Sequence, residues 1–287
     1  MRSEQERAER GAAPDAPWAA LDRQAHQVRT PCGDGEMVWR VWGTGGTPLV
    51  LLHGGAGSWL HWIRTIPAFA GKRRVVVPDL PGLGGSAAPA SGAQGGEIAA
   101  IVAAGLESVL GPDVPFDLAG FSFGGVMAGL IAADRRSTRS LTLIGSGGLG
   151  VIRNSPPLER VRDKTGADRE AAHRVNLGRW MIADPTRIDQ LAIAIQDWNS
   201  QHARLDSRPI GVSDVLLSAL PKVAAPVAGI WGAQDHAVQA EPERPEAVLR
   251  GLRPDLRFRI VPDAGHWVAY EAPELFIEAL RAVLRPA

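Results

Sequence analysis

The sequence predicts an α/β protein built on a mostly parallel sheet with helices on both faces. From about residue 25 onward, short runs rich in Val, Ile and Leu alternate with segments of helical periodicity, which is the pattern of such a sheet. Several runs, such as 49–52 and 75–77, are entirely apolar, as expected for strands buried on both faces. The strand rhythm stops over 146–219, which predicts an insertion within one core domain.

Seven segments are predicted as strands: 37–42, 48–53, 74–78, 114–119, 141–144, 227–231 and 257–261. The first alternates apolar and polar residues, which suits an antiparallel edge. Helical periodicity over 171–181 and 187–198 predicts a helical insertion. Such an insertion would form a lid over the carboxyl ends of the strands, where open α/β sheets bind ligands. Additional core helices without a gating role are the alternative.

The chain therefore divides into three parts. Residues 1–24, rich in Arg, Glu, Ala and Pro, are predicted as a flexible N-terminal arm. Residues 25–145 and 220–287 form the predicted core domain, and residues 146–219 form the predicted helical cap.

Charge and cysteine content exclude several classes of partner. The 31 basic residues equal the 31 acidic ones, so no overall field favours nucleic acid or an anionic membrane. No run approaches the ~18 apolar residues of a membrane span, and the charged first ten residues lack the apolar run of a signal peptide. The single Cys32 has no partner for a disulfide or a metal site. We expect a cytoplasmic protein with no nucleic-acid or membrane partner, and a homo-oligomer remains open.

Ser122 is the predicted nucleophile. It lies in Gly-Phe-Ser-Phe-Gly-Gly, directly after the run 116–119 of a predicted strand and before the helical stretch 126–134. This is the strand–turn–helix setting in which a serine hydroxyl is exposed on a strained elbow. A glycine-rich turn with a capping serine is the alternative reading.

A serine hydroxyl needs a base, and the base needs an acid to orient it. His266 follows the last predicted strand, near the carboxyl edge of the sheet. Asp235 follows the strand 227–231 at the same edge, and Asp263 is a weaker rival in a turn. When the nucleophilic serine lies on such a strand–turn–helix elbow, the catalytic triad follows the chain order Ser, Asp, His. Ser122, Asp235 and His266 have this order.

The oxyanion of an acyl-transfer reaction needs positioned donors. The backbone N–H groups of Phe123, after the nucleophile, and of Gly55, in the turn after 48–53, are predicted to form the oxyanion hole, with Ala56 as the next choice after Gly55.

No cofactor or metal is expected. Residues 145–150 match G-x-G-x-x-G, but Asn-Ser-Pro-Pro follows instead of the helix that a dinucleotide site needs. No His, Cys or acidic cluster has metal-ligand spacing.

Five motifs in order resemble the α/β-hydrolase superfamily: His53-Gly54-Gly55, the segment 79–86, the Ser122 elbow, 231–235 and Gly265-His266-Trp267. The resemblance covers residues from about 25 to 285 and implies an eight-stranded sheet flanked by helices, with an inserted helical lid. Ser122 in place of Asp disfavours the dehalogenase and epoxide hydrolase branches. The segments 55–62 and 265–267 are similar to the meta-cleavage product hydrolases, but Phe121 and His61 stand where those enzymes usually carry Asn.

Aromatic residues cluster near these motifs and are predicted to line an apolar substrate pocket. They are Phe121, Trp59, Trp62 and Trp267, with Trp180 and Trp198 from the insertion; taken singly, each is expected in the core more often than in a pocket, and only the cluster favours a pocket. The expected substrate is a small-to-medium uncharged carboxylic ester, cleaved through an acyl-enzyme. The alternatives are a carbon–carbon hydrolase of the meta-cleavage type, a lactonase, thioesterase or perhydrolase, and a non-catalytic ligand-binding protein on the same fold.

Overall fold

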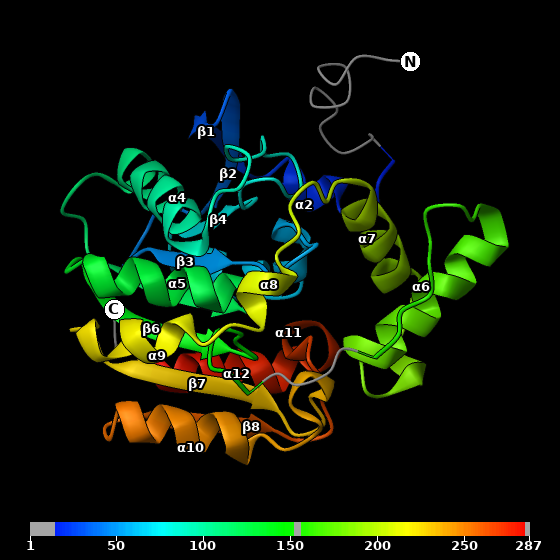
Figure 1. Ribbon diagram of the computed structural model, residues 1–287. Helices are drawn as coiled ribbons and strands as arrows, with labels where there is room; N and C mark the ends of the chain where they lie inside the picture. Colours follow the sequence, from blue (N-terminus) through cyan, green and yellow to red (C-terminus); the bar gives the residue numbers. More distant parts are fainter. Residues whose placement is uncertain (1–14, 152–155, 285–287) are drawn as a thin grey trace.

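The computed structural model describes residues 15–151 and 156–284, and it centres on one eight-stranded sheet (Figure 1). The strand order is β1-β2-β4-β3-β5-β6-β7-β8. Strand β2 is antiparallel to β1 and β4, and the neighbours from β4 to β8 are parallel. The predicted fold class is therefore confirmed. The strands are β1 His26–Cys32, β2 Gly35–Trp42, β3 Leu49–Leu52, β4 Val75–Pro78, β5 Phe116–Phe121, β6 Thr138–Ile144, β7 Val227–Gly232 and β8 Arg257–Val261.

Each of the seven predicted segments overlaps a strand. The sequence analysis missed strand β1. Strand β2 is antiparallel as expected, but the prediction that it forms the edge is wrong because β1 pairs outside it. The sequence of β1, HQVRTPC, is polar and mostly exposed, so it lacks the apolar signal of a buried strand. A proline within it is compatible with an edge position.

Each face of the sheet carries its own apolar core. One core is covered by α4 Gly95–Leu110, α5 Phe123–Asp134, α9 Val215–Ala219, η3 Leu220–Lys222 and α10 Glu243–Leu252. The other is covered by α2 Ala19–Asp22, η1 Trp59–Trp62, α3 Ile66–Ala70, α11 Val268–Glu271 and α12 Pro273–Val283. This double coverage explains why the central strands β3 and β4 are buried throughout.

The described residues between β6 and β7 include α6 Gly166–Trp180, η2 Pro185–Arg187, α7 Gln190–Gln201, α8 Arg208–Gly211, α9 and η3. Helices α6 and α7 extend beyond the end of the sheet as a pair (Figure 1). Helices α8 and α9 return to pack against α5. The predicted segment 146–219 thus has two parts in contact with different regions of the core.

Of the arm predicted for residues 1–24, residues 1–14 lie outside the described residues. Within residues 15–24, Trp18 and Asp22 are buried. Trp18 is only 5% exposed, and Asp22 accepts a hydrogen bond of 2.6 Å from the Arg40 guanidinium in β2. The alanine- and charge-rich composition suggested an arm, but burial of the indole and the ion pair fix this part of the chain.

Candidate active site

The turn between β5 and α5 holds Ser122 in a strained conformation. Its φ is 52° and its ψ is −115°, a region that costs a non-glycine residue about 1–3 kcal/mol. A Cβ on Gly120 would lie 2.2 Å from the carbonyl oxygen of Gly124, so only glycine permits this approach of strand to helix. Ser122 is partly exposed, whereas Phe121 and Phe123 are buried. The elbow therefore leaves the serine partly exposed between two buried phenylalanines.

His266 and Asp235 form a buried pair at the ends of β8 and β7. The Nδ1 atom of His266 lies 2.9 Å from both carboxylate oxygens of Asp235, and the two residues are 1% and 0% exposed. The carboxylate also accepts a 2.8 Å hydrogen bond from the Ala237 N–H at the start of η4 (His236–Val238). This arrangement puts the imidazole proton on Nδ1 and leaves Nε2 as a base.

The Nε2 atom of His266 is buried and has no hydrogen-bond partner among the described residues. Ser122 and His266 are therefore not hydrogen bonded here, which is common before a substrate binds.

Gly145, at the end of β6, brings the serine loop and the Asp–His pair together. Its φ is +48°, and a Cβ there would lie 3.2 Å from the His266 ring and 3.3 Å from the Asp235 carboxylate. Ser122 bonds to this loop at two points: its N–H donates to the Ile144 carbonyl at 2.9 Å, and its carbonyl accepts from the Gly147 N–H at 3.2 Å. The structure thus gathers the three predicted residues around one glycine that the sequence analysis did not single out.

The turn after β3 packs against the serine elbow. A Cβ on Gly55 would lie 3.6 Å from the Cβ of Phe123, so the two residues proposed to supply oxyanion donors are neighbours. The same point lies 2.1 Å from the hydroxyl oxygen of Ser207, a residue that sequence reasoning missed. Ala56 has a φ of 44°, so this turn is also held in an uncommon conformation.

Two neutral histidines hold this turn. His53 donates from Nδ1 to the Gly54 carbonyl and accepts at Nε2 from the Leu80 N–H, both at 2.8 Å. His61 accepts at Nδ1 from the Gly54 N–H at 3.2 Å. Burial lowers the pKa of both rings, and the pKa of His61 falls well below its usual value, with further contributions from His53 and His266. These rings support the turn as hydrogen-bonding groups.

Two of the predicted pocket residues contact His266. The Phe121 ring centroid lies 4.9 Å from that of His266, and the Trp180 centroid, at the end of α6, lies 5.7 Å away. Trp180 is partly exposed and Phe121 is buried. An apolar surface from both the core and the cap therefore adjoins the imidazole.

The other four predicted pocket residues pack elsewhere. Trp59 packs on Trp42 and Trp62 on Phe276, with centroids 5.5 and 6.1 Å apart. Trp267 stacks on Tyr270 at 4.2 Å and donates its indole N–H to the His61 carbonyl at 2.9 Å. Trp198 stacks on His202 at 4.0 Å and meets Trp18 edge-on at 6.2 Å. Trp59, Trp62 and Trp267 are buried core residues, and Trp198 is partly exposed; a role of these four in a substrate pocket stays a prediction.

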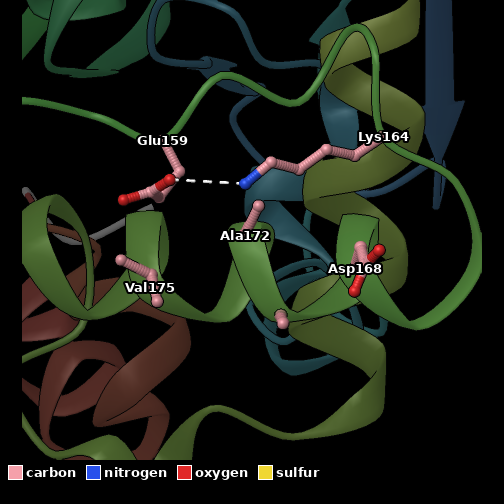
Figure 2. Close-up of a pocket in the computed structure, with 6 residues that line it drawn as sticks. Glu159, Lys164, Asp168, Ala172 and Val175 are labelled. Atoms are coloured by element: carbon pink, nitrogen blue, oxygen red, sulfur yellow. Dashed lines mark hydrogen bonds and ion pairs between the residues drawn. The ribbon is translucent and has the colours of Figure 1, made fainter.

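Figure 2 shows a surface hollow between α6 and the segment that precedes it. It is lined by Glu159, Lys164, Asp168, Ala171, Ala172 and Val175, with an ion pair of 3.3 Å between Lys164 and Glu159. None of these side chains contacts the Asp235–His266 pair. Within residues 15–151 and 156–284, no cluster of three His, Cys or acidic residues could hold a metal ion, and no helix has the length and apolar character to cross a membrane.

Comparison with known proteins gives consistent matches. A model described as the alpha/beta hydrolase family matches residues 49–279. The chain is 32% identical over 265 residues to the dihydrolipoyllysine-residue acetyltransferase component of the acetoin cleaving system of Pseudomonas putida, covering 85% of this chain and 65% of that relative. It thus spans less than two thirds of that relative's length.

The chain is also 28% identical over 255 residues to 2-hydroxy-6-oxo-6-phenylhexa-2,4-dienoate hydrolase of Burkholderia cepacia, covering 80% of this chain and 85% of the hydrolase. Among solved structures, an esterase from Rhodococcus sp. ECU1013 matches with a TM-score of 0.67 and 22% identity, over 90% of this chain and 98% of the esterase. This likeness concerns the fold.

Proposed function

Because the chain belongs to the alpha/beta hydrolase family, whose model matches residues 49–279, we propose that it is a serine hydrolase acting on small-to-medium carboxylic esters. The observation that carries the proposal is the buried His266–Asp235 pair, with both Nδ1–carboxylate distances at 2.9 Å, beside the strained Ser122. A histidine whose Nδ1 is fixed by a carboxylate has its Nε2 free to take a proton.

In the first half of the proposed reaction, the Ser122 hydroxyl oxygen attacks the ester carbonyl carbon while His266 Nε2 accepts the hydroxyl proton. The Asp235 carboxylate stabilises the resulting imidazolium. The N–H groups of Phe123 and Gly55 bind the oxyanion of the tetrahedral intermediate. The imidazolium then protonates the leaving alkoxide, and the alcohol departs from an acyl-enzyme on Ser122.

In the second half, a water molecule attacks the acyl carbonyl and gives a proton to His266 Nε2. The tetrahedral intermediate collapses, the carboxylic acid leaves, and the proton returns to the Ser122 oxygen. Both halves use one base and one oxyanion site, so the proposed residues suffice without a cofactor.

The substrate class rests on the surroundings of His266. Phe121 and Trp180 present aromatic rings there, which favour an uncharged ester with an apolar acyl or alcohol group. A carbon–carbon hydrolase is the second candidate, because one relative is a dienoate hydrolase matched over 80% of this chain. Parallel assays with a lactone, a thioester, a peracid-forming reaction and a ring-fission dienoate would rank these activities. A cytoplasmic location and the state of oligomerisation stay predictions.

The test is Ser122→Ala, assayed with p-nitrophenyl butyrate and with a fluorophosphonate followed by mass spectrometry. We expect the wild-type enzyme to be labelled on Ser122, and the variant to lose at least 10³-fold in kcat, as for removal of a triad nucleophile, while keeping its unfolding midpoint. Ser108→Ala is the control, since that hydroxyl donates to the Ala104 carbonyl on the exposed face of α4. An unlabelled wild-type protein would favour the ligand-binding alternative.

A further inference from the structure

Ser207 lies over the proposed oxyanion turn although it is distant from it in sequence. Its hydroxyl oxygen is 2.1 Å and its Cβ is 3.3 Å from the point where a Cβ on Gly55 would stand. The same point is 3.6 Å from the Phe123 Cβ. Ser207 therefore lies against Gly55, which in turn neighbours Phe123; these are the two residues whose N–H groups are proposed to bind the oxyanion.

The Ser207 hydroxyl is uncommitted. It forms no hydrogen bond with any residue in the described part of the chain, although the residue is only 8% exposed. Two serines that follow Ser207 in the chain differ from it: the Ser213 hydroxyl donates to the Ile210 carbonyl at 2.7 Å, and the Ser218 hydroxyl donates to the Val215 carbonyl at 3.1 Å. A hydroxyl that no described residue engages, on a residue that is itself only 8% exposed, has a donor available for a ligand.

The segment that carries Ser207 is anchored on both sides. Before it, the Arg204 N–H donates to the Gly82 carbonyl at 2.8 Å, and the Arg204 guanidinium donates to Gly84 at 2.9 Å. After it, the Gly211 carbonyl accepts from the Gly148 N–H at 2.9 Å. The carbonyl of Ser207 itself accepts from the Gly211 N–H at 2.9 Å. These bonds fix the backbone, so the hydroxyl needs little reorganisation to act.

We infer that Ser207 is a further catalytic residue, whose hydroxyl donates a hydrogen bond to the carbonyl oxygen of the ester as it becomes an oxyanion. The inference rests on the proposed function. The step transfers no proton: the O–H of Ser207 stays intact and adds one donor to the two backbone N–H groups. A donor at this position strengthens as negative charge develops, so its effect falls on the transition state more than on the bound substrate.

The test compares Ser207→Ala with Ser218→Ala, using p-nitrophenyl butyrate. Loss of one oxyanion donor typically lowers kcat by 10²–10³-fold. Because two donors remain, we expect a fall of at least ~10-fold in kcat for Ser207→Ala, with KM changed less than ~2-fold. The inhibition constant of an alkyl boronic acid, whose serine adduct is tetrahedral, should rise by the factor by which kcat/KM falls. Ser218→Ala should match the wild type.

A purely structural role would lower the unfolding midpoint or raise KM instead of kcat, which would overturn the inference. An increase in kcat would also overturn it, because the hydroxyl would then obstruct the site. If Ser207→Ala keeps kcat while Ser122→Ala is inactive, the inference fails and the proposed function stands. If Ser122→Ala stays active, the proposed function itself fails.

Discussion

Replacing Gly145 by Ala should damage catalysis through the position of His266. The new Cβ would stand 3.2 Å from two atoms of the imidazole and 3.3 Å from the Asp235 carboxylate, so the pair must shift by a few tenths of an ångström. Misplacement of a catalytic group by about 1 Å can cost ~10²-fold, and we expect kcat to fall by roughly 10-fold. The backbone φ of +48° adds a separate cost of about 1–2 kcal/mol to the stability of the variant.

Two matched glycines separate these effects. Gly166 has a φ of +52° but nothing within 4 Å of its Cβ position, so Gly166→Ala should lose stability without losing activity. Gly96, in α4, is equally open and lacks the positive φ, so Gly96→Ala should keep its activity and gain about 0.5–1 kcal/mol. Urea unfolding gives the stabilities, and ester hydrolysis at saturating substrate gives kcat. If Gly145→Ala and Gly166→Ala lose stability equally and both keep wild-type kcat, packing of Gly145 on the Asp–His pair has no role.

Two further predictions concern the supports of the site. Burial lowers the pKa of His61 well below 6.5, so the unfolded chain binds a proton at a higher pH than the folded protein does. The stability that the neutral ring provides above about pH 6.5 is therefore lost as the pH falls below that value. His61→Asn should flatten the dependence of the urea midpoint on pH between 7.5 and 5, and an unchanged slope would contradict this. The Glu271 carboxylate accepts hydrogen bonds from the N–H groups of Gly265, Ala183 and Asp184 at 2.7, 3.0 and 2.8 Å. Glu271→Gln turns one of the acceptor atoms into a donor, so it should lower the free energy of unfolding in urea by about 1–3 kcal/mol. Glu274→Gln, at an exposed position of α12, is its control, and equal stability of the two variants would show that the buried acceptors contribute nothing.

The sequence predicts the elements of this fold because most of its strands are buried on both faces. Runs such as 49–52 and 75–77 have no polar residue to confuse their assignment, and both are strands. β1 shows the limit: an edge strand with one face in solvent needs few apolar residues. Its pairing with β2 depends on a partner rather than on its own composition.

The residues of the candidate site also differ in whether the sequence alone can indicate them. Ser122, Asp235 and His266 could be selected because each directly follows a predicted strand, and parallel strands end at one edge. Gly145 and Ser207 could not, since a glycine after a strand and a serine in a cap loop carry no local signal. Their relation to the site is tertiary: one packs on the Asp–His pair and the other on Gly55. For the tryptophans, nearness in sequence suggested a pocket, but packing buries Trp59, Trp62 and Trp267 in the core, whereas Trp180 contacts the His266 ring.

The cap is bonded to both halves of the proposed machinery. On the side of the base, His266, the backbone N–H of Trp267 donates to the Met181 carbonyl at 2.7 Å. The Glu271 carboxylate also accepts from the N–H groups of Gly265 and of residues 183 and 184. On the oxyanion side, the Ser58 hydroxyl donates to Asn199 of α7 at 2.7 Å. Since these contacts join the His266 loop and the turn after β3 to one helical segment, a change in the cap can alter the base and the oxyanion donors together. We propose that this segment also contacts the substrate, in which case a substitution within it would change substrate preference and kcat together.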